Sequence, residues 1–336
     1  MKIIMISKDQ MVDDLYKFLT SEPQTNRFYW NKSVGFKSEV EFSRLCESLE
    51  FSTLDGGMFL FKKTFPHHAL YATVSRDNKE DYTEFYKQLS SSSIVKNMFF
   101  VQFTGWDDKP IQIEMKTGTT ANLDEKTLGE SRILLKNPKD VPKQKKVKVD
   151  VHSPKFDFFE FKDDSWYACS LDYIRSLFGT TRSQRVGAKK NSFVDYLLEY
   201  SEDEISNIYC DRFFFDVLLG GVDKGMSDID KIIVQDDKYI LVEVKNKTPF
   251  YAENSPDDLS KATFGWDTRR LAWYLFLKND TGLDTRFVVA HIDDKINRKI
   301  LKWKSITMNH WCNCSSWGSD TGDTQMAPYN EFSDLQ

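Results

Sequence analysis

The sequence lacks an apolar run of the length that crosses a bilayer, which is about 18 residues or more. The N-terminal run MKIIMI is too short for the core of a secretory signal peptide, and acidic residues follow it closely. The first 135 residues also lack a phosphate-binding glycine pattern. These absences argue against a membrane-spanning or secreted chain, and we expect a soluble protein of the cytoplasm.

Cysteine is scarce and scattered, which argues against a disulfide framework. The five cysteines are an odd number spread over a long chain, as is typical of reduced intracellular thiols: Cys46, Cys169, Cys210, Cys312 and Cys314. The one close grouping is His310, Cys312 and Cys314. Structural zinc usually takes four ligands in two spaced pairs, and the sequence offers no second pair. We therefore interpret this grouping as incidental and predict no metal there.

Neither sign of charge dominates, because the 336 residues carry a formal net charge of −5. The molecule as a whole does not attract polyanions, so any nucleic-acid surface must be local. Hydrophobic residues make up 40% and aromatic residues 14% of the chain, which is typical of a folded protein. The length is sufficient for two domains of about 100–200 residues each.

Composition suggests how the chain divides. We predict an α+β recognition or regulatory domain over residues 1–135, a lysine- and proline-rich linker over 136–155, a second domain over 156–314 and a polar tail over 315–336. Within the first domain, periodicity predicts helices at Gln10–Leu19 and Asp81–Leu89 and strands at 1–6, 59–65, 69–75 and 97–106.

The second domain shows an alternation of helices and strands. Its predicted elements are helices Asp172–Phe178 and Ser192–Tyr200, a strand at Phe213–Leu219, a hairpin at Met226–Lys247, a helix at Leu259–Leu277 and a strand at Arg286–Ile292. The order helix, strand, hairpin, helix, strand is typical of a mixed sheet flanked by helices. We therefore expect an α/β (α+β) fold.

The hairpin carries two acidic residues that we expect to face each other. A two-residue turn at Asp236–Asp237 would place Asp230 directly opposite Glu243, and alternation would place Lys245 on the same face as Glu243. Directly opposed residues have Cβ atoms about 4.5–5.5 Å apart, where like charges destabilise a sheet. A divalent cation would compensate for the repulsion between these carboxylates.

Two acids, a lysine and a metal ion make a site for phosphodiester hydrolysis. The ammonium of Lys245 could orient or deprotonate a water, or stabilise charge on a phosphoryl oxygen. The alternative is an exposed hairpin on which the acids and the lysine form a salt-bridge ladder. Apolar residues on both sides of Glu243 favour the metal site.

Asp230, followed by Glu243-Val244-Lys245, resembles the D…(D/E)xK pattern of the PD-(D/E)xK nuclease superfamily, which includes restriction endonucleases and phage-defence nucleases. The resemblance covers roughly residues 185–292, and Ile229 stands where the pattern often has proline. It implies a restriction-endonuclease-like sheet in the C-terminal domain. Catalysis would rest on Asp230, Glu243 and Lys245, with Mg²⁺, or Mn²⁺ in its place, held by the two acids.

Members of this superfamily often add an acidic residue from the helix before the hairpin. The candidates for this accessory acid are Asp195 and Glu199, although both fall outside the apolar stripe of their predicted helix. Asp228 is a further candidate, because the predicted register places it opposite Lys245.

Basic residues near the hairpin are candidates for phosphate binding. Arg270 lies within the apolar stripe of the predicted 259–277 helix, so it needs either a structural carboxylate or a substrate phosphate as its partner. Trp266 and Trp273 in the same stripe are predicted to be core residues. A basic segment precedes the hairpin and is either a phosphate-binding loop or a solvated one: Arg175, Arg182, Arg185, Lys189 and Lys190.

The sequence thus predicts a Mg²⁺-dependent endonuclease of the restriction or antiviral-defence type, acting on DNA. Cleavage of both strands would need two such sites, so we expect a homodimer or a higher homo-oligomer. Two alternatives remain open at this point: a nuclease-like fold that binds nucleic acid without cleaving it, and an enzyme that cleaves RNA.

Overall fold

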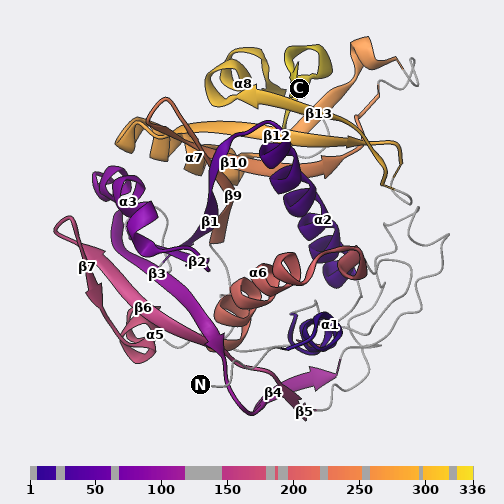
Figure 1. Cartoon of the computed structure of the whole chain (residues 1–336). Helices are drawn as coiled ribbons and strands as arrows, with labels where there is room; N and C mark the ends of the chain where they lie inside the picture. The colour runs from indigo at the N-terminus through magenta and orange to yellow at the C-terminus, as the bar shows by residue number, and fades with distance from the viewer. Residues whose placement is uncertain are drawn as a thin grey trace, which may run out of the picture.

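The computed structural model describes residues 6–19, 27–61, 68–117, 146–178, 186–187, 196–219, 226–251, 258–294, 298–317 and 324–335. Figure 1 shows a long, twisted sheet with helices on both of its faces. The helices α2 (Arg27–Ser48) and α6 (Glu202–Arg212) lie on one side, and α3 (Thr83–Ser90) lies on the other. The expected mixed sheet flanked by helices is therefore present.

In the part of the chain that the structure describes, ten strands form this sheet, in the order β16-β13-β12-β10-β9-β1-β2-β3-β6-β7. Their bounds are β1 Ser52–Phe61, β2 Ala69–Ser75, β3 Val95–Trp106, β6 Pro154–Lys162, β7 Ser165–Ala168, β9 Met226–Gln235, β10 Lys238–Lys247, β12 Asp284–Ile292, β13 Ile300–Thr307 and β16 Ser333–Asp334. Strands β1, β9 and β10 are antiparallel neighbours, whereas β12 runs parallel to β10.

Other elements cover the sheet and its ends. Two small sheets have the strand orders β11 (Thr263–Asp267), β15 (Thr324–Pro328), β14 (Ser316–Trp317) and β5 (Lys146–Val151), β4 (Ile111–Thr117), β8 (Val186–Gly187). The remaining α-helices are α1 Lys8–Phe18, α5 Leu171–Phe178, α7 Thr268–Thr281 and α8 Met308–Cys314. Within the described residues, no helix combines the length and the apolar composition that crossing a bilayer requires.

The main core lies between the sheet and the helices α3, α7 and α8. Phe59 of β1, Leu241 of β10, Trp273 of α7 and Trp311 of α8 belong to the same buried cluster. On the opposite face, Phe42 and other residues of α2 pack against β9, β10 and β12 in a separate cluster. The central strands are therefore covered on both faces, which explains the apolar runs within them, such as Ile232–Val234 and Ile240–Val242.

The structure does not confirm the expected separation of an N-terminal domain at residue 135. Strand β1 pairs with β9, with Met58 opposite Asp228 and Thr53 opposite Ile233, so a strand from the N-terminal region lies beside the hairpin. The main core also joins Phe59 of β1 to Trp273 of α7. Pairing between segments so distant in sequence leaves no local compositional signal, so composition alone could not predict it.

The expected linker and tail also contribute strands. Of residues 136–155, the stretch 146–151 forms β5 and β6 begins at Pro154, whereas 136–145 lie outside the described residues. The period-two alternation KVKVDV indicates a strand despite its lysines. In the tail, β15 and β16 are ordered strands, and Phe332 between them is buried in the main core.

The predicted strand at Phe213–Leu219 is instead a π-helical turn, Phe213–Leu218, which continues α6. A short apolar run does not distinguish a buried strand from a buried helix. Here the run continues α6, which begins after Ser201, whose hydroxyl accepts a hydrogen bond from the N–H of Glu204. Of the predicted Ser192–Tyr200 helix, residues 196–199 form a 3-10 turn and 192–195 lie outside the described residues.

The predicted helix Leu259–Leu277 is divided. Its first part forms a short turn and strand β11, and α7 begins only at Thr268. The carboxylate of Asp267 accepts hydrogen bonds from the N–H groups of Arg269 and Arg270, which fixes this helix start. Trp266 and Trp273 are both buried in the core, as predicted, although one lies on the strand and the other on the helix.

Several predicted elements are confirmed. The 69–75 strand matches β2, the 97–106 strand lies within β3, the 286–292 strand lies within β12, and the 10–19 helix overlaps α1. The 59–65 strand overlaps the end of β1, and most of the predicted 1–6 strand lies outside the described residues. The 22-residue helix α2, in contrast, was not predicted, and it proves important for the site.

Candidate active site

The hairpin β9–β10 has the predicted turn and register. The turn residues Asp236–Asp237 have φ angles of 50° and 58°, which is the left-handed geometry of a tight two-residue hairpin loop. Pairing runs from Gln235 opposite Lys238 to Lys231 opposite Val242. The recorded pairing ends there, one residue before Asp230 and Glu243, whose side chains meet beyond it.

Alternation along β10 sends its side chains into different surroundings. Leu241 packs in the main core beside α3 and α7, whereas Val242 and Val244 pack in the cluster beneath α2. Glu243 follows Leu241 to the α7 side and has no exposed surface. A carboxylate in such a position requires polar partners, because burying an unpaired charge is costly.

Both carboxylate oxygens of Glu243 have polar side-chain partners. Its Oε1 lies 2.5 Å from Nζ of Lys245 and 2.6 Å from Nη1 of Arg270. Its Oε2 lies 3.0 Å from the hydroxyl of Tyr274, which also lies 2.6 Å from the backbone oxygen of Asp228. Tyr274 is four residues beyond Arg270 on α7, so both side chains project from the same face of that helix.

Asp230 joins this cluster from β9. Its Oδ2 accepts a 2.6 Å hydrogen bond from the N–H of Val244 and lies 3.7 Å from Nζ of Lys245. Burial raises the pKa of Asp230 well above its usual range. The ammonium of Lys245 opposes this shift, and the negative charges of Glu243, Glu39 and Asp228 add to it. Asp230 is thus an acid whose charge the protein alone does not fully compensate.

The carboxylates around Lys245 stabilise its positive charge. Burial lowers its pKa, but the carboxylates of Glu243 and Asp230 together outweigh burial, and the net pKa lies above the ordinary value for lysine. Of the roles considered from the sequence, a cation that stabilises negative charge agrees with this environment better than a base.

Asp228 completes a group of three carboxylates. One oxygen each from Asp228, Asp230 and Glu243 lies within 4.8 Å of the others, and Oδ1 of Asp228 lies 2.5 Å from Nη1 of Arg270. The sequence left two partners open for Arg270, and the structure places it between carboxylates.

A further acidic side chain near the cluster comes from a helix that the sequence did not predict. Glu39 of α2 lines the same cavity as Asp230 and Lys245, and its charge acts on Asp230. Of the three predicted candidates, Asp228 lines this cavity, Glu199 is exposed and does not, and Asp195 lies outside the described residues. Apolar Phe36 and Val40, four residues apart, are the sequence signal that could have revealed this helix and its inward polar face.

The cavity beside the cluster has a volume of about 590 Å³ and lies between α2, α6 and the strands β1, β9 and β10. Acidic side chains outnumber basic ones among its lining residues. Three cations line it besides Lys245 and Arg270: Lys231, Arg212 and Arg298. Lys231 contacts Asp55 at 2.9 Å, Arg212 contacts Asp211, and Arg298 donates to Asn246 at 2.9 Å.

Within the described residues, the predicted basic segment does not line the cavity. Arg175 is exposed, contacts Asp172 at 3.6 Å and does not line the cavity. The other members of the segment lie outside the described residues: Arg182, Arg185, Lys189 and Lys190.

The chain was compared with protein-family models, with curated proteins and with solved structures, and none of them matches it. The description of the site therefore depends on its geometry and chemistry.

Proposed function

We propose that this protein is a Mg²⁺-dependent nuclease that hydrolyses phosphodiester bonds in DNA. One observation carries the proposal: Asp228, Asp230 and Glu243 gather their oxygens within 4.8 Å, with Nζ of Lys245 beside two of them, at the edge of a cavity. The resemblance of Asp230 and Glu243-Val244-Lys245 to the PD-(D/E)xK pattern supports the same function.

The donor set fits a hard divalent cation. Mg²⁺ takes carboxylate oxygens and usually keeps several waters for contact with substrate phosphates. When all three are ionised, Asp228, Asp230 and Glu243 carry one more negative charge than Lys245 and Arg270 neutralise. Burial, together with the charges of Glu243, Glu39 and Asp228, raises the pKa of Asp230, and a bound cation would oppose that shift. Asp230 and Glu243 would hold the ion, with Asp228 as a third ligand, and Mn²⁺ would meet the same requirements.

Each protein group then has a distinct task. The bound cation would polarise a phosphoryl oxygen and lower the pKa of a water. Lys245 holds a positive charge where negative charge develops on the phosphoryl group, and Arg270 with Tyr274 fixes the orientation of the Glu243 carboxylate. Glu39 adds negative charge from the opposite wall of the cavity.

The arrangement of elements around the hairpin also supports this function. Helix α2, strand β1, hairpin β9–β10, helix α7 and strand β12 surround the site and together form a mixed sheet flanked by helices, although α2 and β1 replace the helix and strand expected at 192–200 and 213–219. The first two elements come from the N-terminal region. We propose that the described elements that lie between β1 and β9 in the chain are an insertion within this unit and recognise the target.

The test is a cleavage assay on supercoiled, linear and single-stranded DNA and on RNA, with Mg²⁺, Mn²⁺ or EDTA. We expect metal-dependent cleavage of DNA that is lost in Glu243→Gln, with Glu199→Gln as an exposed acidic control that keeps it. Cleavage of RNA alone would redirect the proposal to a ribonuclease. Binding without cleavage under all metal conditions would identify a non-catalytic nucleic-acid-binding module and overturn the proposal.

A further inference from the structure

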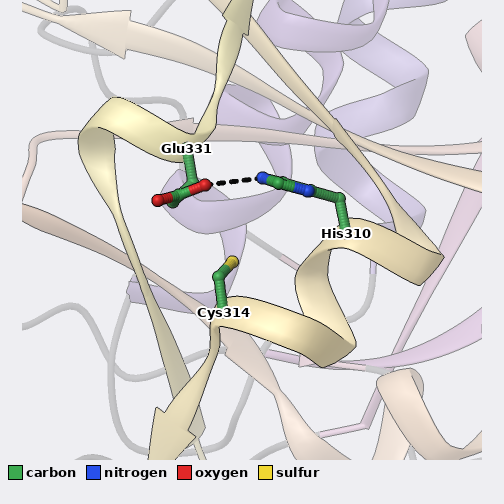
Figure 2. Close-up of side chains that lie close together, drawn as sticks. All are labelled: His310, Cys314 and Glu331. Atoms are coloured by element: carbon green, nitrogen blue, oxygen red, sulfur yellow. Dashed lines mark hydrogen bonds and ion pairs between the residues drawn. The ribbon is translucent and has the colours of Figure 1, made fainter.

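Three side chains with different ligand atoms meet at the C-terminal end of the fold, far from the hairpin in sequence. Figure 2 shows His310, Cys314 and Glu331 pointing toward one another, with the imidazole and the carboxylate joined by a dashed line. Nε2 of His310 lies 2.6 Å from Oε2 of Glu331, and the ligand atoms of all three lie within 4.8 Å of one another.

Two elements present these side chains on a fixed framework. His310 and Cys314 are four residues apart on α8, so they project from one face of the helix. Glu331 ends the 3-10 turn Tyr329–Glu331 that leads to the edge strand β16. Because Trp311 and Phe332 beside them are both buried, with ring centroids 6.1 Å apart, the backbones carrying the ligands are held by the core.

We propose that His310, Cys314 and Glu331 bind a divalent transition metal of the zinc class. Imidazole nitrogen, thiolate sulfur and carboxylate oxygen are the three donor types that Zn²⁺ accepts, and thiolate excludes Mg²⁺ as the preferred ion. Three protein ligands leave a fourth, solvent-facing position, in agreement with the side-chain exposure of 49% for His310 and 41% for Glu331.

Small side-chain rotations bring the three atoms to metal-binding distances. Bonds of about 2.0–2.3 Å to a shared ion place ligand atoms roughly 3.3–3.8 Å from one another. His310 and Glu331 would separate slightly from their 2.6 Å contact, and Cys314 would approach both. The ion would then fasten α8 to the segment that leads into β16, and so stabilise that edge of the sheet.

The sequence alone did not reveal this site, because Glu331 is 21 residues beyond His310. The grouping of His310, Cys312 and Cys314 had suggested a ligand pair without a complement. Cys312 is exposed and is absent from the cluster of three, whereas Cys314 is its thiol member. Cys312 therefore provides a matched control, two residues from the proposed ligand on the same helix.

The experiment is a titration of the full chain with Co²⁺ after treatment with chelator, followed by absorption spectroscopy. A thiolate bound to Co²⁺ produces charge-transfer absorption in the near ultraviolet, so the signal reports a cysteine ligand and is silent for the carboxylates of the hairpin. We expect the band to saturate at one Co²⁺ per chain, and to disappear in Cys314→Ser and in His310→Ala. Glu331→Gln should weaken binding roughly tenfold or more.

Two controls make the result specific. Cys312→Ser should keep the band, and so should Asp230→Asn, since the hairpin site is separate from this one. Zn²⁺ should raise the melting temperature of the wild type and of Cys312→Ser but leave His310→Ala unchanged. The proposal is overturned if the wild type shows no thiolate band, if His310→Ala keeps it, or if Cys312→Ser removes it.

Discussion

Nη1 of Arg270 lies 2.6 Å from Oε1 of Glu243, a buried carboxylate 27 residues away in the chain. The same nitrogen lies 2.5 Å from Oδ1 of Asp228. Burial opposes the charge of Arg270, but Glu243 and Asp228 together outweigh burial and raise the pKa of Arg270 well above its usual value. Arg270 thus ties both strands of the hairpin to the first turn of α7, within the group of carboxylates that would hold a metal.

Replacing Arg270 by glutamine should destabilise the protein and increase the stabilisation that Mg²⁺ provides. The change leaves Glu243 buried with one cationic partner fewer, which typically costs roughly 3 kcal/mol in free energy of unfolding. Mg²⁺ should restore part of this loss, because it supplies positive charge to the same carboxylates. Denaturant unfolding in EDTA and in Mg²⁺ measures both effects.

The control for this change is Arg269→Gln, because Arg269 is the exposed neighbour on the same helical turn. It should unfold within a few tenths of a kcal/mol of the wild type in either condition. Equal stability of Arg270→Gln and wild type in EDTA would contradict a structural role for the Arg270–Glu243 contact.

Asp230→Asn should abolish cleavage yet raise stability at neutral pH in EDTA. The pKa of Asp230 is raised in the folded state, so its ionisation on going from acid to neutral pH opposes folding. Asparagine carries no such charge and still offers an oxygen to the N–H of Val244. The melting temperature of the variant should therefore exceed that of the wild type at pH 7 to 8.

This advantage should shrink as the pH falls toward about 4, the ordinary pKa of an aspartate, because this side chain is then protonated in the unfolded chain as well as in the folded protein. Melting curves recorded in EDTA across this range show whether the two proteins converge. Addition of Mg²⁺ at neutral pH should stabilise the wild type and not the variant. A wild type that melts above Asp230→Asn throughout would be inconsistent with the raised pKa.

Lys245→Met should separate metal binding from catalysis. The ammonium contacts Glu243 and Asp230, but its proposed task is to stabilise charge on the substrate, so the variant should lose about 10²-fold or more in cleavage rate. Stabilisation by Mg²⁺ should persist, since the carboxylates remain. Single-turnover cleavage and thermal melting, each with and without Mg²⁺, provide the two readouts, and an undiminished rate would remove Lys245 from the mechanism.

Glu39→Gln tests the contribution of α2. Removing this negative charge should bring the pKa of Asp230 closer to its ordinary value, which shifts the pH dependence of stability in EDTA. It should also weaken Mg²⁺ binding, measured by calorimetry. Glu41→Gln serves as the control, because Glu41 lies on the same helix, contacts Arg44 at 3.1 Å and does not line the cavity. Equal Mg²⁺ affinity in both variants would exclude Glu39 from the site.

Local sequence determined the hairpin and the central residues of its site. The Asp236–Asp237 turn fixes which residues pair, and strict alternation then decides that Glu243 and Leu241 point the same way. Both features depend on neighbours in the chain, so they can be predicted without knowledge of the rest of the fold. Asp230 lies just beyond the recorded pairing, where its carboxylate accepts a hydrogen bond from the N–H of Val244.

Tertiary structure alone decided what surrounds this hairpin. Strand β1 and helix α2, which carries Glu39, reach the site from the N-terminal region, and Glu331 joins His310 and Cys314 from another element. These contacts depend on which apolar faces can be buried against one another across the whole chain. Local periodicity does not predict which distant faces pack together. For the same reason the apolar run 213–219 indicated burial correctly but not whether it would be helix or strand.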